Sequence, residues 1–239
     1  MMILDWIMWS YFVVAPIYII LTYKKHKAMV IAKPSIRASL YTSTVIGIWV
    51  PTLVMFFYQM SNPGFAPTLI WLKSWSLTWL TLACLLFCLI CYLSWSINKL
   101  RQDNTNDSNI RAGIGSVLWL LPATKQEMKR FVFAVSPSAG ICEEILYRGF
   151  LLGMLNEVVH MSAAIVISSI AFATPHLYQG MIGFIKTFIL GTLFAVIVIV
   201  SESLLLAIIL HTVIDMYVGL MSYFILNRST ELQQPDALS

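Results

Sequence analysis

The sequence predicts an all-α protein, a polytopic transmembrane bundle of about seven spanning helices, from its composition and the lengths of its apolar runs. The chain has 239 residues, of which 59% are hydrophobic and 11% are charged, and its mean hydropathy is +0.81. Soluble domains carry about 25% charged residues. Because 11% charged residues are too few to cover a water-exposed surface, we expect the chain to contact the lipid bilayer. The formal net charge of +4 gives no indication of nucleic acid, and we expect none as a partner.

Apolar runs justify the individual helices, because a span needs about 20 apolar residues. Three runs precede the polar stretch Asn98–Ser116, which we expect to be a loop, and four follow the mixed segment Leu118–Arg130. That segment either lies flat at the interface or adds an eighth span. The predicted spans are Ile3–Tyr23, Ser39–Met60, Leu77–Ile97, Phe131–Leu155, Ser162–Ala173, Ile182–Val200 and Leu204–Leu226. Ser162–Ala173 is rich in small residues, which let helices approach closely, so we expect it at the centre of the bundle.

The polar stretch divides the chain into a first membrane region, residues 1–113, a second membrane domain, 114–226, and a tail, 227–239. Basic residues gather in the first and third loops, whereas the second holds only Lys73. Since cytoplasmic loops are enriched in Lys and Arg, this pattern predicts a multi-pass protein of the cell membrane. Its N-terminus would lie outside and its C-terminal tail in the cytoplasm.

Ionisable residues inside the predicted spans of the second half, or at the end of one in the case of His176, indicate a site. A charged side chain at mid-membrane costs roughly 2.5–3.5 kcal/mol, and six such residues in three spans are more than helix–helix contacts require. They are Glu143, Glu144, Arg148, His176, His211 and Asp215.

Helical spacing indicates different roles for these residues. Glu144 and Arg148 are four positions apart, so they share a face and can pair. Glu143 lies about 140° round the helix from Arg148, so it can face a polar cavity instead. His211 and Asp215 are also four apart, which suits either two ligands of one metal or an Asp that orients a His. His176, from another helix, can complete the set.

Three short motifs resemble those of the CPBP family, the CAAX prenyl protease and bacteriocin-processing proteins, also called the Abi family. The string Glu143-Glu144-Ile145-Leu146-Tyr147-Arg148 resembles the Glu-Glu-x-x-x-Arg motif of that family. Phe172-Ala173-Thr174-Pro175-His176 resembles its Phe-x-x-x-His motif, and His211-Thr212-Val213-Ile214-Asp215 its His-x-x-x-Asn/Asp motif. The similarity covers about Leu118–Tyr223, so the second domain, 114–226, would be the catalytic one.

The resemblance implies a glutamate-dependent intramembrane endopeptidase. Glu143 would activate the hydrolytic water, and His176 and His211 would stabilise the oxyanion or bind a metal. Asp215 would orient His211 or join a zinc ligand set formed by His176, His211 and Asp215. The remaining motif residues would support the site, namely Glu144 and Arg148.

The substrate implied by the resemblance is a membrane-bound peptide or protein. The family's roles include pheromone or bacteriocin maturation, self-immunity and CAAX-type processing, and the sequence does not choose among them. A non-catalytic membrane scaffold or bacteriocin-immunity protein of the same fold is the alternative. A proton-coupled transporter is disfavoured, because the polar residues fall in one half of the chain only, whereas many transporters carry paired repeats.

Overall fold

The computed structural model describes residues 3–61, 76–103, 105 and 107–232, and within these ranges it contains helices and no strand. The predicted all-α bundle is confirmed. The long helices are α1 (Ile3–Ala32), α2 (Ile36–Ser61), α3 (Leu77–Gln102), α8 (Met161–Ala173), α9 (Met181–Ser201) and α10 (Leu204–Leu232). The shorter elements are α4 (Asp107–Ile114), α5 (Lys125–Arg130), η1 (Phe131–Val135), α6 (Ser136–Glu144), η2 (Ile145–Leu151), α7 (Leu152–Asn156) and η3 (Thr174–Gln179).

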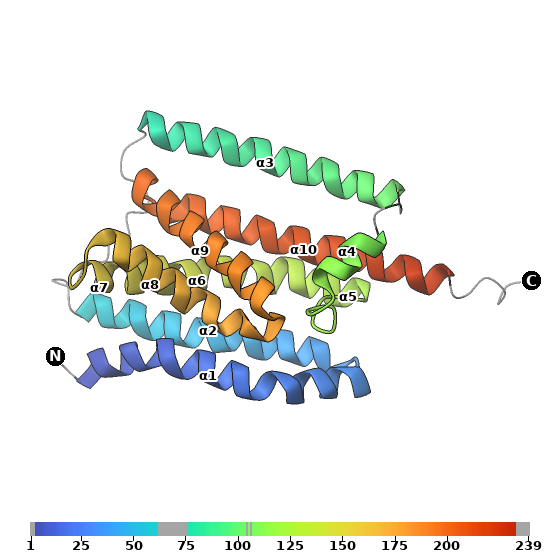
Figure 1. The fold of residues 1–239 in the computed structure, drawn as a ribbon, viewed down its shortest axis with the longest axis horizontal. Coiled ribbons are helices and arrows are strands. Elements are labelled where there is room, and N and C mark those ends of the chain that lie inside the picture. Colours follow the sequence, from blue (N-terminus) through green and yellow to red (C-terminus); the bar gives the residue numbers. More distant parts are fainter. Residues whose placement is uncertain (1–2, 62–75, 104, 106, 233–239) are drawn as a thin grey trace, which may run out of the picture.

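The two predicted membrane regions pack as one bundle. Figure 1 shows α1 and α2 on one side, α3 on the opposite side, and the C-terminal elements between them. α1 packs on α2 and η3, α2 packs on α6 and η1, and α3 packs on α10 and α9. The Trp49 Nε1 donates a 3.0 Å hydrogen bond to the Ser138 Oγ and so joins α2 to α6. The boundary at residue 113 therefore separates sequence segments, and helices from both lie around one core.

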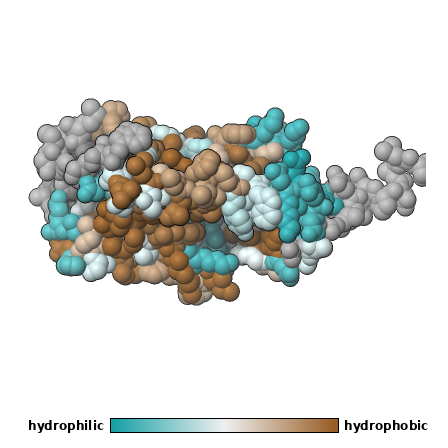
Figure 2. Space-filling model, turned by 90° about the horizontal axis from the view of Figure 1, so that it is seen from above, coloured by the Kyte–Doolittle hydropathy of each residue, from teal (hydrophilic) through white to brown (hydrophobic). Residues whose placement is uncertain are grey.

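Five described helices are long and apolar enough to cross a membrane, namely Ile36–Tyr58, Leu77–Gln102, Met161–Gln179, Met181–Ser201 and Leu204–Arg228. They correspond to five of the seven predicted spans. The other two are also helical, as α1 and as the succession η1–α6–η2–α7. Hydrophobic residues cover much of the middle of the face in Figure 2, and hydrophilic residues lie at both ends, most of them at the right-hand end of the view.

Several element boundaries in the structure differ from the predicted ones. The stretch Asn98–Ser116 is largely helical, because α3 continues to Gln102 and α4 follows. Of Leu118–Arg130, only Lys125–Arg130 forms a helix, α5. α10 runs on to Leu232, so the start of the predicted tail 227–239 is helical. Residues 233–239 of that tail and Lys73 of the second loop lie outside the described residues.

The fourth predicted span is the central one, and the expectation for Ser162–Ala173 was wrong in part. Every residue from Leu146 to Leu152 is buried. By contrast, α8 buries one face that includes Ala164 and Ser168, whereas Ile167 and Ile170 on its other face are 43% and 45% exposed. The small residues of α8 do pack closely, but on one side only. A helix face of Ile and Val beyond them is suited to lipid.

Two π-helical segments interrupt the central helix. η1 opens it and η2 follows directly after Glu144, so that Arg148 lies in the second. π-helical turns are rare and occur frequently at functional sites, since the extra residue changes the direction in which side chains point. The second segment begins where the two neighbouring glutamates end α6.

Candidate active site

One carboxylate oxygen joins the two predicted motif helices. The Arg148 Nη1 and the His211 Nδ1 each lie 2.9 Å from the Glu144 Oε1 and donate to it. The side chains of Glu144, Arg148 and His211 are 0%, 1% and 8% exposed. The predicted pairing of Glu144 with Arg148 is confirmed. The bond from His211 is new, and it makes Glu144 the residue that fixes the orientation of this imidazole.

Asp215 does not take that role. Its Oδ2 lies 3.8 Å from the His211 Nε2, beyond hydrogen-bond distance. The Glu143 Oε2 lies 3.9 Å from the same nitrogen. The side chain of Glu143 is 22% exposed and that of Asp215 is 32% exposed, whereas the side chain of Glu144 is fully buried. One ring nitrogen of His211 thus faces a buried carboxylate, and the other faces two carboxylates that remain accessible.

A glycine permits this arrangement. α6 and α10 pack closely at Gly140, where an added Cβ would clash with the Thr212 side chain and lie 2.9 Å from the Thr212 backbone nitrogen. Gly140 precedes the two glutamates on α6, and Thr212 follows His211 on α10. Because no larger residue fits there, the backbones approach closely enough for Glu144 to reach His211.

α9 supplies two site residues that the motifs do not contain. The Arg148 Nη2 donates a 3.0 Å hydrogen bond to the Gly191 carbonyl oxygen. The Phe194 ring stacks on the His211 ring with centroids 5.1 Å apart and an interplanar angle of 19°. The Arg148 guanidinium lies 5.3 Å from the centroid of Phe194. Gly191 stands between bulky residues in the middle of the apolar run Met181–Ser201, and a small residue there is a sequence signal for such a close approach.

His176 lies in η3, just beyond α8. Its Nδ1 is 3.2 Å from the Phe172 carbonyl oxygen. The Phe172 ring contacts both motif histidines, with centroids 5.7 Å from His176 and 5.8 Å from His211, and the Arg148 guanidinium lies 4.1 Å from its centroid. Phe172 therefore separates the two imidazoles and holds each in place, as the shared aromatic of the second motif.

The predicted zinc set is not assembled as the side chains stand. Structural and catalytic zinc sites need three or four His, Cys, Asp or Glu ligands about 2.0–2.3 Å from the ion. Among the described residues, no group of three or more such side chains could hold a metal ion. His176, His211 and Asp215 thus do not come together as a ligand set.

The described residues thus define an all-α membrane protein in which one buried carboxylate and two accessible ones surround His211. Residues 126–217 match the family model described as Type II CAAX prenyl endopeptidase Rce1-like. This segment carries all three motifs, and the match supports a relationship to the CPBP/CAAX protease family. Neither the curated proteins nor the solved structures gave a match to this chain. The family supports a CAAX-type intramembrane endopeptidase kind of function.

Proposed function

We propose that this chain is a glutamate-dependent intramembrane endopeptidase in which Glu143 is the general base. One observation carries the proposal: of two adjacent glutamates, only Glu143 is accessible and uncommitted to the buried Arg148. A general base must reach a water and the substrate, and it must be free to take up and release a proton. Glu144, bonded by both Arg148 and His211, meets neither requirement.

The reaction then follows from the positions of the groups. Glu143 takes a proton from water, and the hydroxide oxygen bonds to the carbonyl carbon of the scissile peptide. The carbonyl oxygen gains negative charge, which an N–H donor must stabilise. Collapse breaks the C–N bond, and the proton on Glu143 passes to the leaving nitrogen. The immediate products are a carboxylic acid and an amine, the acid then gives its proton to the amine to leave a carboxylate and an ammonium ion, and Glu143 has returned to its initial state.

The histidines are the candidate donors to that oxyanion. The His211 Nδ1 is committed to Glu144, so its Nε2 is the nitrogen directed toward Glu143. When the ring is protonated, Nε2–H can donate to the carbonyl oxygen. His176 is the second candidate donor. Asp215 lies beside the same nitrogen and would help to hold the protonated ring.

The substrate we propose is a membrane-bound peptide or protein, cleaved near the membrane face at which the basic loops lie. The motif residue His176 belongs to η3, which packs against α1, and the ring of Tyr178 in η3 contacts Tyr23, directly before the basic Lys24 and Lys25. Enrichment of Lys and Arg in cytoplasmic loops would make this the cytoplasmic side, with the N-terminus outside. Pheromone or bacteriocin maturation, self-immunity and CAAX-type processing all fit such a substrate.

The test compares Glu143→Gln with the matched variant Glu157→Gln. Glu157 lies in the exposed turn after α7. Both variants are reconstituted into vesicles with lipid-anchored reporter peptides, and cleavage is measured by mass spectrometry. We expect Glu143→Gln to lower the rate by about 10²–10⁴-fold, because the amide cannot accept the proton, and Glu157→Gln to leave it unchanged.

The same variants distinguish the scaffold alternative. If Glu143→Gln keeps full cleavage, the general-base assignment fails. If it abolishes cleavage and yet keeps the full cellular phenotype, the physiological role is that of a non-catalytic scaffold or immunity protein. Chelation followed by addition of zinc tests metal assistance, since restored activity would show that ligands rearrange around an ion when substrate or metal binds.

A further inference from the structure

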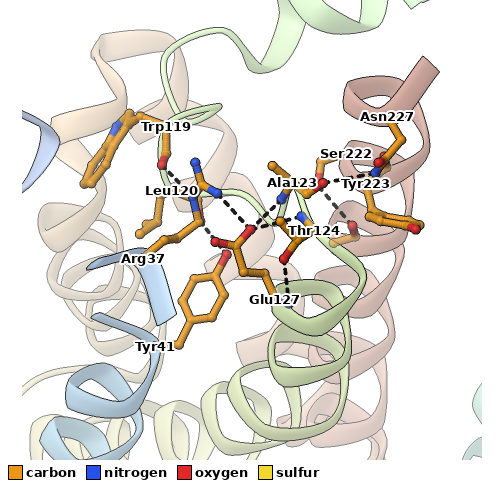
Figure 3. A network of polar contacts seen from close by, with 11 residues as sticks. Arg37, Tyr41, Trp119, Leu120, Ala123, Thr124, Glu127, Ser222, Tyr223 and Asn227 are labelled. Atoms are coloured by element: carbon orange, nitrogen blue, oxygen red, sulfur yellow. Dashed lines mark hydrogen bonds and ion pairs between the residues drawn. The ribbon is translucent and has the colours of Figure 1, made fainter. Parts of the chain in front are cut away.

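The linker between α4 and α5, residues 115–124, has turns and no regular helix, yet side chains from three helices hold its backbone. From α2, the Arg37 Nε donates to the Trp119 carbonyl (3.0 Å) and the Tyr41 hydroxyl to the Leu120 carbonyl (2.7 Å). From α5, the Glu127 Oε2 accepts from two backbone N–H groups of the linker, each at 3.0 Å. From α10, the Asn227 Nδ2 donates to a linker carbonyl at 3.0 Å. Figure 3 shows these contacts together.

The centre of this network is a buried ion pair. The Arg37 Nη1 lies 2.8 Å from the Glu127 Oε2, and the two side chains are 10% and 9% exposed. Burying two charges costs free energy unless the geometry is good and further hydrogen bonds are made. Here the guanidinium bonds a carboxylate and a linker carbonyl at once. The first membrane region thus fixes a linker whose chain lies just before the family-matched segment 126–217.

The fixed linker presents Trp119 to the site. Its ring meets the Tyr178 ring edge-on, with centroids 6.4 Å apart. The Tyr178 ring in turn stacks on His176, with centroids 6.4 Å apart and an interplanar angle of 25°, and contacts Tyr23 of α1 at 6.2 Å. Tyr178 therefore lies against His176, and Tyr23 and Trp119 lie against Tyr178. We call these three aromatic residues from three segments the aromatic wall (Tyr23, Trp119 and Tyr178). In Figure 3 the Trp119 ring lies at the edge of the network opposite to Asn227.

We propose that Trp119 is a specificity-determining residue, and that Arg37 is the positioning residue that holds it. The aromatic wall fills the space next to His176, so the substrate can place only a small side chain there. This inference rests on the proposed function, because His176 is taken as part of the site. It gives the first membrane region, which carries no family motif, a part in choosing the substrate.

A labelling experiment tests the wall without relying on catalysis. His176→Cys places a thiol beside Tyr178, and its reaction with a small and a bulky maleimide is followed at that position by mass spectrometry. Trp119→Ala in this background should raise the ratio of bulky to small labelling at least fivefold. Trp95→Ala is the matched control, since Trp95 is an exposed residue of α3 that contacts Tyr92 and Lys99. Equal ratios for the two variants overturn the proposal.

Arg37→Lys tests the positioning step. Lysine keeps the charge but lacks the planar fork that bonds Glu127 and the Trp119 carbonyl at once. We expect the labelling ratio to rise, by less than for Trp119→Ala. If only Trp119→Ala raises it, Arg37 has no positioning role. Trp119→Phe, expected to give an intermediate ratio, replaces the alanine variant if the latter fails to fold.

A peptide panel then tests specificity itself. Lipid-anchored reporter peptides carry Gly, Ala, Leu or Phe directly after the scissile bond, and kcat/KM is measured for each. The wild type should favour Gly and Ala, and Trp119→Ala should raise kcat/KM for Leu and Phe at least tenfold while leaving Gly within twofold. An unchanged preference overturns the specificity role. If the wild type cleaves none of the peptides, the proposed function fails, and the labelling ratio alone decides whether the wall exists.

Discussion

The two glutamates that stand side by side in the sequence belong to different regions of the site. The sealed region contains Glu144, Arg148, Gly191 and Phe194, and its Glu144 side chain is 0% exposed. The open region contains Glu143, His176 and Asp215, and its Glu143 side chain is 22% exposed. His211 links the two, with Nδ1 on the sealed side and Nε2 on the open side. The carboxylate of Glu144 therefore supports the structure of the site, whereas the carboxylate of Glu143 is available for a reaction.

The difference follows from what surrounds each carboxylate. Glu144 has two charged or polar donors on one oxygen, while its Oε2 has no hydrogen-bond partner among the described residues. Glu143 points toward the accessible side, where no Arg holds it. We therefore expect substitutions in the sealed region to lower stability, and those in the open region to change activity alone.

The largest effect should come from Arg148→Met. Removing the guanidinium leaves Glu144 buried without its counter-charge, and breaking such a pair typically costs about 3–5 kcal/mol. The measurement is the free energy of unfolding in mixed micelles. Arg130→Met, at the exposed end of α5, is the control. A loss below about 1 kcal/mol, the size expected of an exposed pair, would show that water reaches Glu144 and that the region is not sealed.

Neutralising each glutamate in turn separates the two regions directly. Glu144→Gln keeps the shape but weakens two charge-assisted bonds, and we expect a loss of about 2–3 kcal/mol. Glu143→Gln should change the free energy of unfolding by less than about 0.5 kcal/mol. Both values come from the same unfolding titration. Similar losses for the two variants would remove the distinction between support and chemistry.

A backbone substitution on α9 tests the sealed region from its other side. A Cβ at Gly191 would lie 2.9 Å from the Phe172 Cδ1 and 3.1 Å from the Arg148 Nη2. Gly191→Ala should therefore cost about 1–2 kcal/mol through overpacking. Gly47→Ala is the matched control, because nothing lies within 4 Å of the added Cβ, and alanine favours the α2 helix by up to about 1 kcal/mol. If both variants gain stability, α9 is not packed tightly against Arg148.

The sequence predicts the sealed pair better than the rest of the site. Glu144 and Arg148 are four residues apart on one helix, so their pairing needs only local geometry. The bond between Glu144 and His211 joins residues 67 positions apart, and it depends on how closely α6 and α10 approach at Gly140. Local spacing allowed Asp215 either to orient His211 or to join it as a metal ligand, but it could not show that the Glu144 Oε1 lies 2.9 Å from the His211 Nδ1 whereas the Asp215 Oδ2 lies 3.8 Å from the Nε2.

For the fold, hydropathy predicts that each long helix exists. It predicts less well which faces of a helix are buried and where the helix departs from regular α geometry. Run length located α2, α3, α9 and α10 to within a few residues at their starts. It could not give the π-helical segments around Glu144, since periodicity assumes a regular helix. Nor could it tell that α8 exposes Ile167 and Ile170, because lipid and protein interior select the same apolar residues.

The smallest effect we predict is that of Asp215→Asn in the open region. Asn has nearly the same shape as Asp, so this substitution removes only the charge. The Asp215 Oδ2 lies 3.8 Å from the His211 Nε2 and its side chain is 32% exposed, so no hydrogen bond or buried charge is lost. We expect kcat/KM within about threefold of the wild type, a change in transition-state stabilisation below about 0.7 kcal/mol. A hundredfold loss measured on the same reporter peptides would mean that the open region needs both carboxylates, and that Glu143 does not act as the base without the charge of Asp215.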